Sequence, residues 1–472
     1  MSAPFTPRER FWVSTAITLG FLLLLGGNLR EVSAKEKGGG GLYEQLKVFT
    51  DVLAIVQRDY VKEVENKKLV EGAIKGMLTT LDPHSGYLDP DFYQDLQVQT
   101  KGEFGGLGIE ITIKDGLLIV VAPMEGSPAE RAGIKSGDAI VKIEGKFTKE
   151  YSLVDAVKRL RGPKGSPITI SVSRKGHPDL IDVTLLRDNI QVRSVRSRFL
   201  GDGFGYVRIN QFMEKTFDDL KAGLRAVRGE AKGDIRGLIL DVRNNPGGLL
   251  AQAIKVSDMF LKEGVIVYTD GRVDAQKQKF FAHARDTEPG YPIVVLVNGG
   301  SASASEIVAG ALKDHGRALI LGTQTFGKGS VQTITPLENG GALTLTTALY
   351  YTKSGNSIQA MGVKPDIEVV GPEESLEEPP ASPKQSLRVR ESDLPGAINN
   401  PSGGGKDASP LNKLNKVPEQ RDDLFNPETE DLGAWLARDP QLQKGLDLLK
   451  TFNIFKGPVQ EARVVPPTAQ AG

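Results

Sequence analysis

The stretch GGSASASEIVAGALKDHGRALILGTQTFGKGSVQ, residues 299–332, decides the fold of this chain. Up to residue 305 it consists of Gly, Ala and Ser alone, which lets the backbone turn tightly and lets another segment approach closely. Residues 306–314 then follow a helical pattern, and residues 318–321 are a short apolar run typical of a buried strand. A glycine-rich loop over residues 322–329 comes last. The polar residues therefore lie in the turns of an alternating pattern of helix and strand.

Two residues in these turns are suited to act together, Ser303 and Lys328. Lys328 is the only charged residue between Arg317 and Glu338, so the neighbouring sequence supplies no carboxylate to hold its proton. Burial would lower the pKa of such a lysine and make it a usable base. Ser303 lies where the helix begins, and there backbone amides and the helix dipole can stabilise an anion. A serine nucleophile needs a base and oxyanion donors, so the pair predicts a Ser–Lys hydrolase site.

Other interpretations of the same residues compete with this one. A serine at a helix start is commonly an N-cap, and a lysine in a glycine loop is commonly solvated. The loop over residues 322–329 also nearly matches the phosphate-binding pattern G-x-x-x-x-G-K-[ST], and residues 238–241 imitate a metal-binding strand. The loop departs from the pattern at Gly329, which has no hydroxyl for magnesium, and the strand lies upstream of it. A nucleotide-binding protein stays an alternative.

Three motifs in this region resemble the carboxyl-terminal processing proteases, a family of serine peptidases with a Ser–Lys dyad. They are SASASE at residues 301–306, AGALKDHGRA at 309–318 and TFGKGSVQ at 325–332. The resemblance implies that Ser303 is the nucleophile, that Lys328 is the general base and that Gln332 positions the lysine. It extends from about residue 42 to the C-terminus and is weakest over residues 371–424.

A second motif of the same family lies upstream, at residues 241–248. It reads DVRNNPGG, with Val242 in place of the family's leucine. The resemblance implies that Gly247 or Gly248 donates one oxyanion amide and that Ala304 donates the other; both are backbone donors and need no side chain. The fold it implies is an α/β layered core of the ClpP or crotonase kind. Glu306 is interpreted as a first-turn helix acid that is favourable to the dipole.

Residues 102–188 change in character toward short strands. The expected strands are residues 108–113, 117–122, 139–143, 168–173 and 181–186, with helices at 128–132 and 153–161. This pattern resembles a PDZ domain, in which an extended peptide adds to a sheet edge and backbone amides hold its terminal carboxylate. By that resemblance the carboxylate cradle is Gly106, Leu107, Gly108 and Ile109; a glycine turn without binding function is the plainer alternative.

The composition excludes several classes of function. Lys and Arg balance Asp and Glu at 59 each, which argues against a nucleic-acid partner. The chain has no cysteine, so thiol nucleophiles, thiolate metal sites and disulfides are excluded. It has four histidines, at positions 84, 177, 283 and 315, so a Ser-His-Asp triad is poorly supplied. We expect neither a metal nor a cofactor, and we expect His315 to cap a helix dipole and His84 to be a turn residue.

The N-terminus carries an apolar run over residues 11–27, preceded by Arg8 and Arg10. It is typical of a signal peptide or a membrane anchor. Ala34 ends a small-residue cleavage pattern, but the charges of Arg30 and Glu31 lie beside it and favour an uncleaved anchor in the inner membrane. Either outcome predicts a cell-envelope, periplasmic or secreted protein.

Amphipathic helices are expected at both ends of the folded region, over residues 42–61 and 68–81 and over residues 431–438 and 441–455. The expected divisions are a signal or anchor (1–34), an N-terminal helical region (35–95), a PDZ domain (96–188), a protease core (189–372), a disordered linker (373–425) and C-terminal helices (426–472). The resemblance implies that the terminal helices pack together and support a homo-oligomer.

These observations predict an exported serine endopeptidase. Its PDZ domain would hold protein substrates with apolar C-termini, and PDZ occupancy would position Lys328 and Gln332. An adaptor protein is a further partner that such an enzyme can use. A non-catalytic tail-binding scaffold is the alternative of a different class, and it would require a broken dyad.

Overall fold

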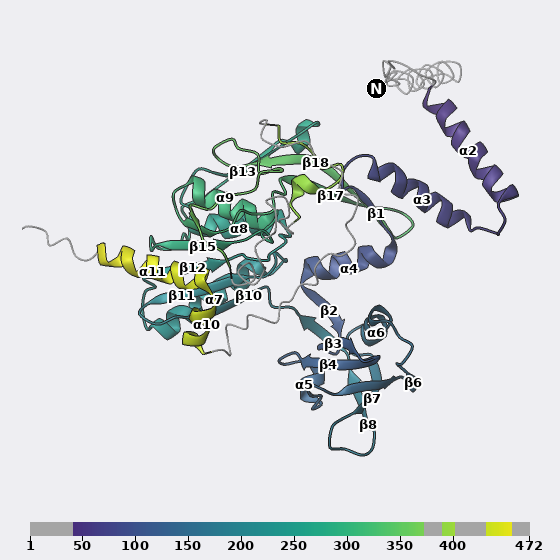
Figure 1. Ribbon diagram of the computed structural model, residues 1–472, viewed down its shortest axis with the longest axis horizontal. Helices are drawn as coiled ribbons and strands as arrows, with labels where there is room; N and C mark the ends of the chain where they lie inside the picture. The colour runs from purple at the N-terminus through teal and green to yellow at the C-terminus, as the bar shows by residue number, and fades with distance from the viewer. Residues whose placement is uncertain (1–40, 372–388, 402–430, 456–472) are drawn as a thin grey trace, which may run out of the picture. The chain divides into compact units, whose positions relative to one another are not determined.

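The computed structural model describes residues 41–371, 389–401 and 431–455 (Figure 1). They form two compact units, one reaching to Ala73 and one starting at Ile74, and each is described by itself. Within the described residues, no helix has both the length and the apolar character needed to cross a membrane. The predicted anchor at residues 11–27 lies outside these residues.

The first unit holds helix α2 (Leu42–Asp59) and the start of α3 (Asn66–Thr79), which confirms two of the predicted helices. The apolar stripe of α2 includes Leu46, Phe49 and Val52, and all three side chains are exposed. No residue of α2 is buried, so this helix has an apolar face without a described partner.

A mostly β module follows the turn after α3 and helix α4 (Pro90–Lys101). Its antiparallel sheet has the order β3-β4-β5-β7-β8, with β6 paired to β5. The strands are β3 (Ile109–Lys114), β4 (Leu117–Pro123), β5 (Ala139–Ile143), β6 (Lys146–Phe147), β7 (Pro167–Ser173) and β8 (Ile181–Leu186). Helices α5 (Pro128–Arg131) and α6 (Leu153–Leu160) complete it. The predicted strands and helices are thereby confirmed within one or two residues.

This module has its own core and a separate connection to the rest of the chain. Its buried cluster includes Val120, Ile140, Ile170 and Val172, which alternate inward along their strands. Strands β2 (Glu103–Gly106) and β9 (Asp188–Gln191) pair with each other where the chain enters and leaves. An inserted domain connected in this way is what the sequence predicted.

The central sheet of the largest part has the order β10-β11-β12-β15-β16-β19. Its strands are β10 (Val195–Phe199), β11 (Phe204–Ile209), β12 (Gly237–Asp241), β15 (Ile293–Val297), β16 (Leu319–Gly322) and β19 (Ile367–Glu368). All neighbouring pairs are parallel except β10 with β11. β12 and β15 are buried at every position, as parallel strands covered on both faces are.

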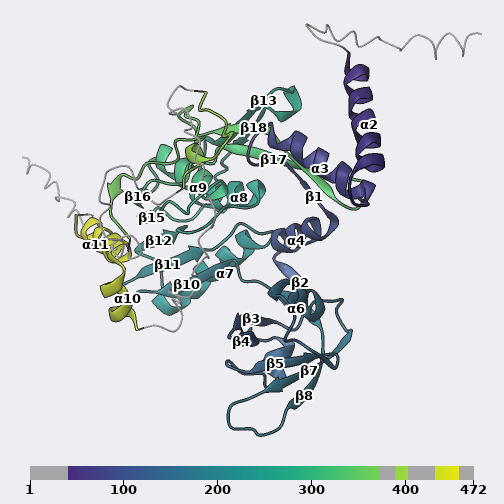
Figure 2. The ribbon, with the colours of Figure 1, turned by 45° about the vertical axis from the view of Figure 1, so that its right-hand side comes forward.

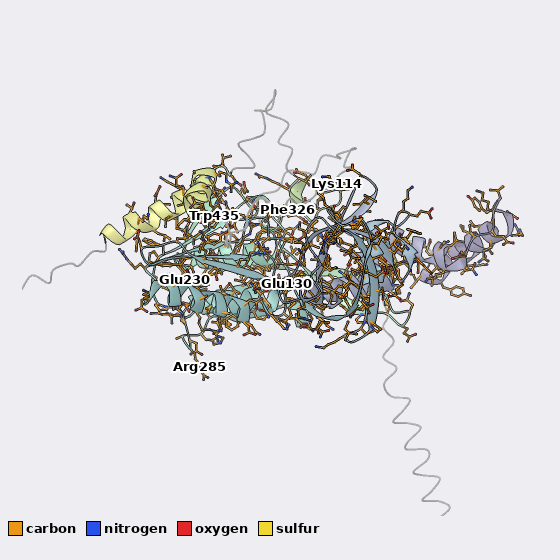
Figure 3. All side chains as sticks on the ribbon, turned by 90° about the horizontal axis from the view of Figure 1, so that it is seen from below. Lys114, Glu130, Glu230, Arg285, Phe326 and Trp435 are labelled. Carbon is orange, nitrogen blue, oxygen red and sulfur yellow. The ribbon has the colours of Figure 1, made fainter. Side chains whose placement is uncertain are left out.

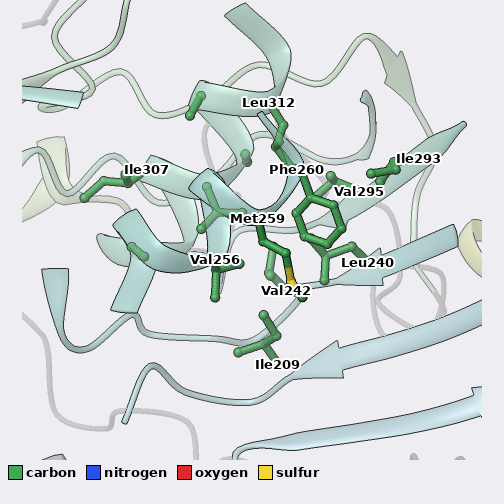
Figure 4. Close-up of a cluster of buried hydrophobic side chains, with 14 of the residues drawn as sticks. Ile209, Leu240, Val242, Val256, Met259, Phe260, Ile293, Val295, Ile307 and Leu312 are labelled. Carbon is green, nitrogen blue, oxygen red and sulfur yellow. The ribbon is translucent and has the colours of Figure 1, made fainter. Parts of the chain in front are cut away.

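Alternate residues of these strands face two different helical layers. Leu238, Leu240 and Val295 join the cluster formed by α7 (Thr216–Ala231), α8 (Leu250–Phe260) and α9 (Ala304–Asp314) (Figure 4). Ile239 and Leu296 point to the opposite face. A second sheet of β1 (Gly86–Leu88), β13 (Val265–Gly271), β14 (Gln278–Phe281), β17 (Ser330–Pro336) and β18 (Ala342–Tyr351) adds a further layer beside α8 and α9. The predicted layered α/β core is confirmed.

The C-terminal helices α10 (Leu432–Arg438) and α11 (Pro440–Phe455) cover that opposite face (Figures 1 and 2). Trp435, labelled in Figure 3, packs edge-on against Tyr206 at a ring distance of 4.8 Å. Leu442 and Leu446 are buried in the same cluster. The apolar side of these helices packs on the sheet, and their packing with the N-terminal helices stays a prediction.

The predicted disordered linker at residues 373–425 is interrupted by a docked segment, residues 389–401. It contains the short 3-10 helix η2 (Glu391–Asp393), and both Glu391 and Asn400 are buried. Asn400 donates to the carbonyls of Ser357 and Gln359 at 3.1 and 2.7 Å. The linker prediction was wrong for this segment, whereas residues 372–388 and 402–430 lie outside the described residues.

Candidate active site

Three turns meet at one edge of the central sheet. They follow the adjacent parallel strands β12, β15 and β16 and comprise residues 242–248, 298–303 and 323–329. Because parallel strands end at the same edge, the motif DVRNNPGG and the first residues of the motifs SASASE and TFGKGSVQ come together there. This is the position at which α/β sheets commonly hold their reactive groups.

Asn245 connects the glycine motif to the serine turn. Its carbonyl accepts from the amide of Ala302 at 3.0 Å and from the hydroxyl of Ser305 at 2.9 Å. Its side-chain amide donates to the carbonyl of Ile209 at 2.8 Å, so Asn245 also holds β11. The residue is fully buried, and these contacts fix the approach of the two turns.

Ser303 is the N-cap residue of α9, but its side chain makes no capping hydrogen bond. Its backbone has φ 55° and ψ −113°, in a region that costs a non-glycine residue roughly 1–3 kcal/mol. The hydroxyl of Ser303 instead pairs with the phenol of Tyr350. Ser303 therefore occupies the N-cap position, but its hydroxyl does not act as an N-cap.

Lys328 is largely buried in the loop after β16, and burial lowers its pKa. The carboxylates of Glu391, Asp82 and Glu306 act in the other direction. These three carboxylates are distant from Lys328 in the sequence. Lys328 therefore has acidic neighbours in the folded chain, although the sequence on either side of it is uncharged. In the described ranges, no hydrogen bond or ion pair joins the Lys328 amino group to the Ser303 hydroxyl.

Glu306 connects the serine turn to the lysine loop. One carboxylate oxygen accepts from Ser303 N at 2.8 Å and Lys328 N at 2.9 Å; the other accepts from Thr325 Oγ1 at 2.5 Å and Gly327 N at 2.7 Å. The side chain is fully buried, and burial raises its pKa to about 7 against the lowering effect of these donors. Its interpretation as a simple first-turn acid is therefore incomplete, since it holds both candidate catalytic segments.

The glycine motif lies directly against the serine turn. A Cβ added to Gly247 would lie 2.8 Å from the Cβ of Ser303 and 2.9 Å from the amide nitrogen of Ala304. The amide of Gly247 already donates to Asn245 Oδ1 at 2.9 Å. Among the described residues, the amides of Gly248 and Ala304 have no acceptor, and Ala304 begins α9, where amides lack helical partners. Of the two glycines, Gly248 has the amide available for an oxyanion.

Gln332 lies on β17, and within the described residues no hydrogen bond joins its side chain to Lys328. Its amide donates to Ser330 Oγ at 3.0 Å and to Thr346 Oγ1 at 3.3 Å. The hydroxyl of Thr346 in turn donates to Asp82 at 2.9 Å. Gln332 is therefore linked by hydrogen bonds to the turn at residues 82–85, which supplies part of the lysine's surroundings.

Two alternatives from the sequence do not fit the geometry. The loop at residues 322–329 leads into strand β17, whereas a phosphate-binding loop needs a helix there. His315 is the C-cap of α9, at the far end from Ser303, and its ring lies 2.8 Å from the carbonyl of Val265. In the part of the chain that the structure describes, no His, Asp and Glu cluster is suited to a metal ion.

The loop predicted to hold a peptide carboxylate borders an open strand edge. β3 is the terminal strand of its sheet, and α6 packs beside it. Gly108 has φ 70°, and a Cβ there would lie 2.3 Å from the Cβ of Ser127. Within the described ranges the amides of Leu107 and Gly108 find no acceptor. Gly106 ends β2 and Ile109 begins β3, so the four residues form the turn into the edge strand.

Sequence reasoning missed several residues of this site. Asn245, Tyr350, Asp82, His84 and Glu391 all lie around the three turns or the lysine loop. The position of Glu306 three residues after Ser303 was a usable signal, because an N3 glutamate often reaches back to the N-cap amide. For Glu391 the sequence offers no such signal.

Comparisons with known proteins agree along most of the chain. Residues 203–369 match peptidase family S41, residues 119–174 match the PDZ domain, and residues 27–92 match the N-terminal domain of the activating protease CtpB. A carboxy-terminal-processing protease of Bartonella bacilliformis is 52% identical over 331 residues, covering 70% of this chain and 76% of that protein. The carboxy-terminal processing protease CtpA of Bacillus subtilis is 34% identical over 374 residues, covering 76% of each.

Among solved structures, the photosystem II D1 C-terminal processing protease is 31% identical to this chain, with coverage of 68% of this chain and 86% of that chain and a TM-score of 0.41. The two bacterial proteases each match more than two thirds of this chain, and the family models match both the PDZ domain and the layered core. The chain therefore belongs to peptidase family S41 and is a serine-type carboxy-terminal processing protease with a PDZ domain.

Proposed function

We propose that the protein is an exported endopeptidase that cleaves protein substrates with a Ser303–Lys328 dyad. The observation that carries the proposal is Glu306, a buried carboxylate bonded to the amides of both residues. It keeps the nucleophile turn and the lysine loop adjacent, although no hydrogen bond joins the two side chains in the described structure. A hydrogen bond from the Ser303 hydroxyl to the neutral Lys328 amino group would complete the dyad.

In this mechanism Lys328, in its neutral form, takes the proton of the Ser303 hydroxyl as the oxygen attacks the peptide carbonyl. The amides of Gly248 and Ala304 stabilise the resulting oxyanion. The ammonium of Lys328 then gives the proton to the leaving amine. Burial favours the neutral lysine that this step requires.

Substrate tails would bind to the PDZ domain as an added strand on β3. The amides of Leu107 and Gly108 have no acceptor within the described residues and are available for a terminal carboxylate. We further propose that occupancy of the PDZ domain brings Lys328 and Gln332 into position, since the side chain of Gln332 donates to Ser330 and Thr346 in the described arrangement. Dimerisation through the exposed stripe of α2 and use of an adaptor belong to the same proposal.

Export rests on the sequence alone. The apolar run at residues 11–27, with Arg8 and Arg10 before it, would direct the chain to the cell envelope and hold it at the inner membrane. Cleavage near Ala34 would release it to the periplasm or the exterior.

The full chain should cleave an unstructured protein that ends in apolar residues. Ser303→Ala and Lys328→Ala should abolish cleavage, whereas Lys353→Ala, which changes an exposed lysine on a nearby turn, should not. Amidation of the substrate's C-terminus should slow cleavage by the parent. Equal cleavage by the Lys328→Ala variant at neutral pH would refute the dyad, and equal rates on free and amidated tails would refute carboxylate recognition.

A further inference from the structure

The docked segment, residues 389–401, lies outside the part of the chain that matches family S41 and contacts the lysine loop directly. The amide of Glu391 donates to the carbonyl of Phe326 at 3.2 Å. The guanidinium of Arg390 donates to Gln324 Oε1 at 3.2 Å. Both acceptors precede Lys328 in the same loop, so the segment holds that loop from one side.

Gln359 bonds to the loop just after Lys328 and joins it to the same docked segment. Its Oε1 accepts from the amide of Gly329 at 2.9 Å, and its Nε2 donates to Glu391 Oε1 at 3.0 Å. Gln359 and Glu391 are both fully buried. Glu391 is therefore connected to the residues before and after Lys328: its amide bonds to Phe326, and its carboxylate is linked to Gly329 through Gln359.

The carboxylate of Glu391 has a second partner, the ring of His84. Its Nε2 lies 3.0 and 2.8 Å from the two carboxylate oxygens. The side chain of Glu391 is 1% exposed, and that of His84 is 17% exposed. A buried carboxylate needs partners of this kind, because leaving it unpaired is costly. Glu391 and His84 therefore form a largely buried pair rather than a surface contact.

The ionisable groups around this point are few and can be named. Lys328 is influenced by Glu391, Asp82 and Glu306, in that order, and the phenol of Tyr350 is influenced by Glu306 and Glu391. Asp82 accepts from the amides of His84 and Ser85 and from two hydroxyls. Glu306 accepts from three amides and a hydroxyl. Glu391 differs from both in that it belongs to a segment that reaches the site from beyond the protease core.

We propose that Glu391 is a positioning residue for the general base. Its backbone amide and its contact with Gln359 fix the lysine loop, and its carboxylate, which His84 holds, supplies Lys328 with a buried counter-charge. The inference rests on the proposed role of Lys328. When residues 389–401 are docked, the charge of Glu391 favours the protonated form of Lys328. The segment therefore positions the base and also lowers the fraction of it that is neutral. Removing the charge should favour the neutral, active lysine at lower pH.

The test compares the pH dependence of kcat/KM for the full chain and three variants. Glu391→Gln keeps the shape and removes the charge, so its acid limb should move to lower pH, with activity several-fold above the parent on that limb. Glu391→Asp keeps the charge, so its limb should stay with the parent's while the plateau falls. Asp393→Asn is the control, because Asp393 accepts from the Arg390 amide within its own turn, and its profile should match the parent's.

The outcomes separate this inference from the proposed function. If Lys328→Ala is inactive but the Glu391→Gln limb coincides with the parent's, the role of Glu391 is refuted and the dyad stands. If Lys328→Ala remains active, the dyad itself fails. An acid-shifted limb in Glu391→Asp would also overturn the proposal, and this result remains decisive if the glutamine variant does not fold. Folding is checked by the fluorescence of Trp435, which is buried in the core.

Discussion

Replacing Glu306 with glutamine should show how much the connection between the two catalytic segments contributes. Each carboxylate oxygen accepts two hydrogen bonds, from Ser303 N and Lys328 N on one side and from Thr325 Oγ1 and Gly327 N on the other. A glutamine turns one oxygen into an NH2 group, which then faces two donors. An unsatisfied buried donor costs about 1–3 kcal/mol, so the expected loss is about 2–6 kcal/mol.

A plain first-turn acid would behave differently. Its interaction with the helix dipole contributes only about 0.3–1 kcal/mol. Asp218→Asn provides the matched control, because Asp218 is an exposed acid in the first turn of α7. If Glu306→Gln costs no more than this control, and kcat/KM is unchanged, the connecting role is refuted. If the role is correct, kcat/KM should also fall on the order of 100-fold, as misplacement of reacting groups does.

The assay is urea unfolding followed by the fluorescence of Trp435. The chain has two tryptophans, and a Trp12→Phe background removes the other one, so the signal reports the protease core. The pH dependence supplies a second readout. Because burial raises the pKa of Glu306 to about 7, its stabilising contribution is complete below its usual pKa near 4.5 and is lost as the pH rises through 7. The resulting change in the free energy of unfolding amounts to about 3 kcal/mol. Glu306→Gln should not show this pH-dependent change.

Three further changes test other parts of the site. Lys328→Arg should lower kcat by about 100- to 10,000-fold in a peptidase assay, because arginine stays protonated; an active arginine variant would exclude Lys328 as the base. Gly247→Ala should lower kcat/KM at least 100-fold, because its Cβ would meet the Ser303 turn at 2.8 Å; unchanged rates would mean that the turn can move aside. Asp439→Asn should destabilise the core by about 3–5 kcal/mol in Trp435 unfolding, because Asp439 pairs with the buried Arg243 at 2.8 Å; a loss below 1 kcal/mol would contradict this.

The elements that the sequence predicted correctly are those whose residues carry their own signal. Residues 293–297 are an unbroken apolar run, and such a run is expected of a strand covered on both faces. The turns that carry Ser303 and Lys328 lie at one sheet edge because they follow the adjacent parallel strands β15 and β16. Local patterning predicted the strands and the turns, but it did not predict the order of the strands in the sheet.

The sequence was less informative about packing partners than about elements. The apolar residues of α11 predicted that another element covers this helix, but nothing in the helix indicated that the central sheet does so. Residues 389–401 read VRESDLPGAINNP and show no helical or strand periodicity. Their docking involves the buried hydrogen bonds of Glu391 and Asn400, which leave no periodic pattern in the sequence. Long-range polar contacts of this kind become visible only when the chain is folded.

The most direct test of the central claim is to trap the acyl-enzyme and locate it. The full chain is mixed with an activated ester of a short peptide, quenched in acid and mapped by peptide mass spectrometry. We predict that the acyl group is found on Ser303, that it forms far more slowly in Lys328→Ala, and that it is absent from Ser303→Ala. An acyl group on another residue, or formation in Lys328→Ala at the parent's rate, would contradict a Ser303–Lys328 protease.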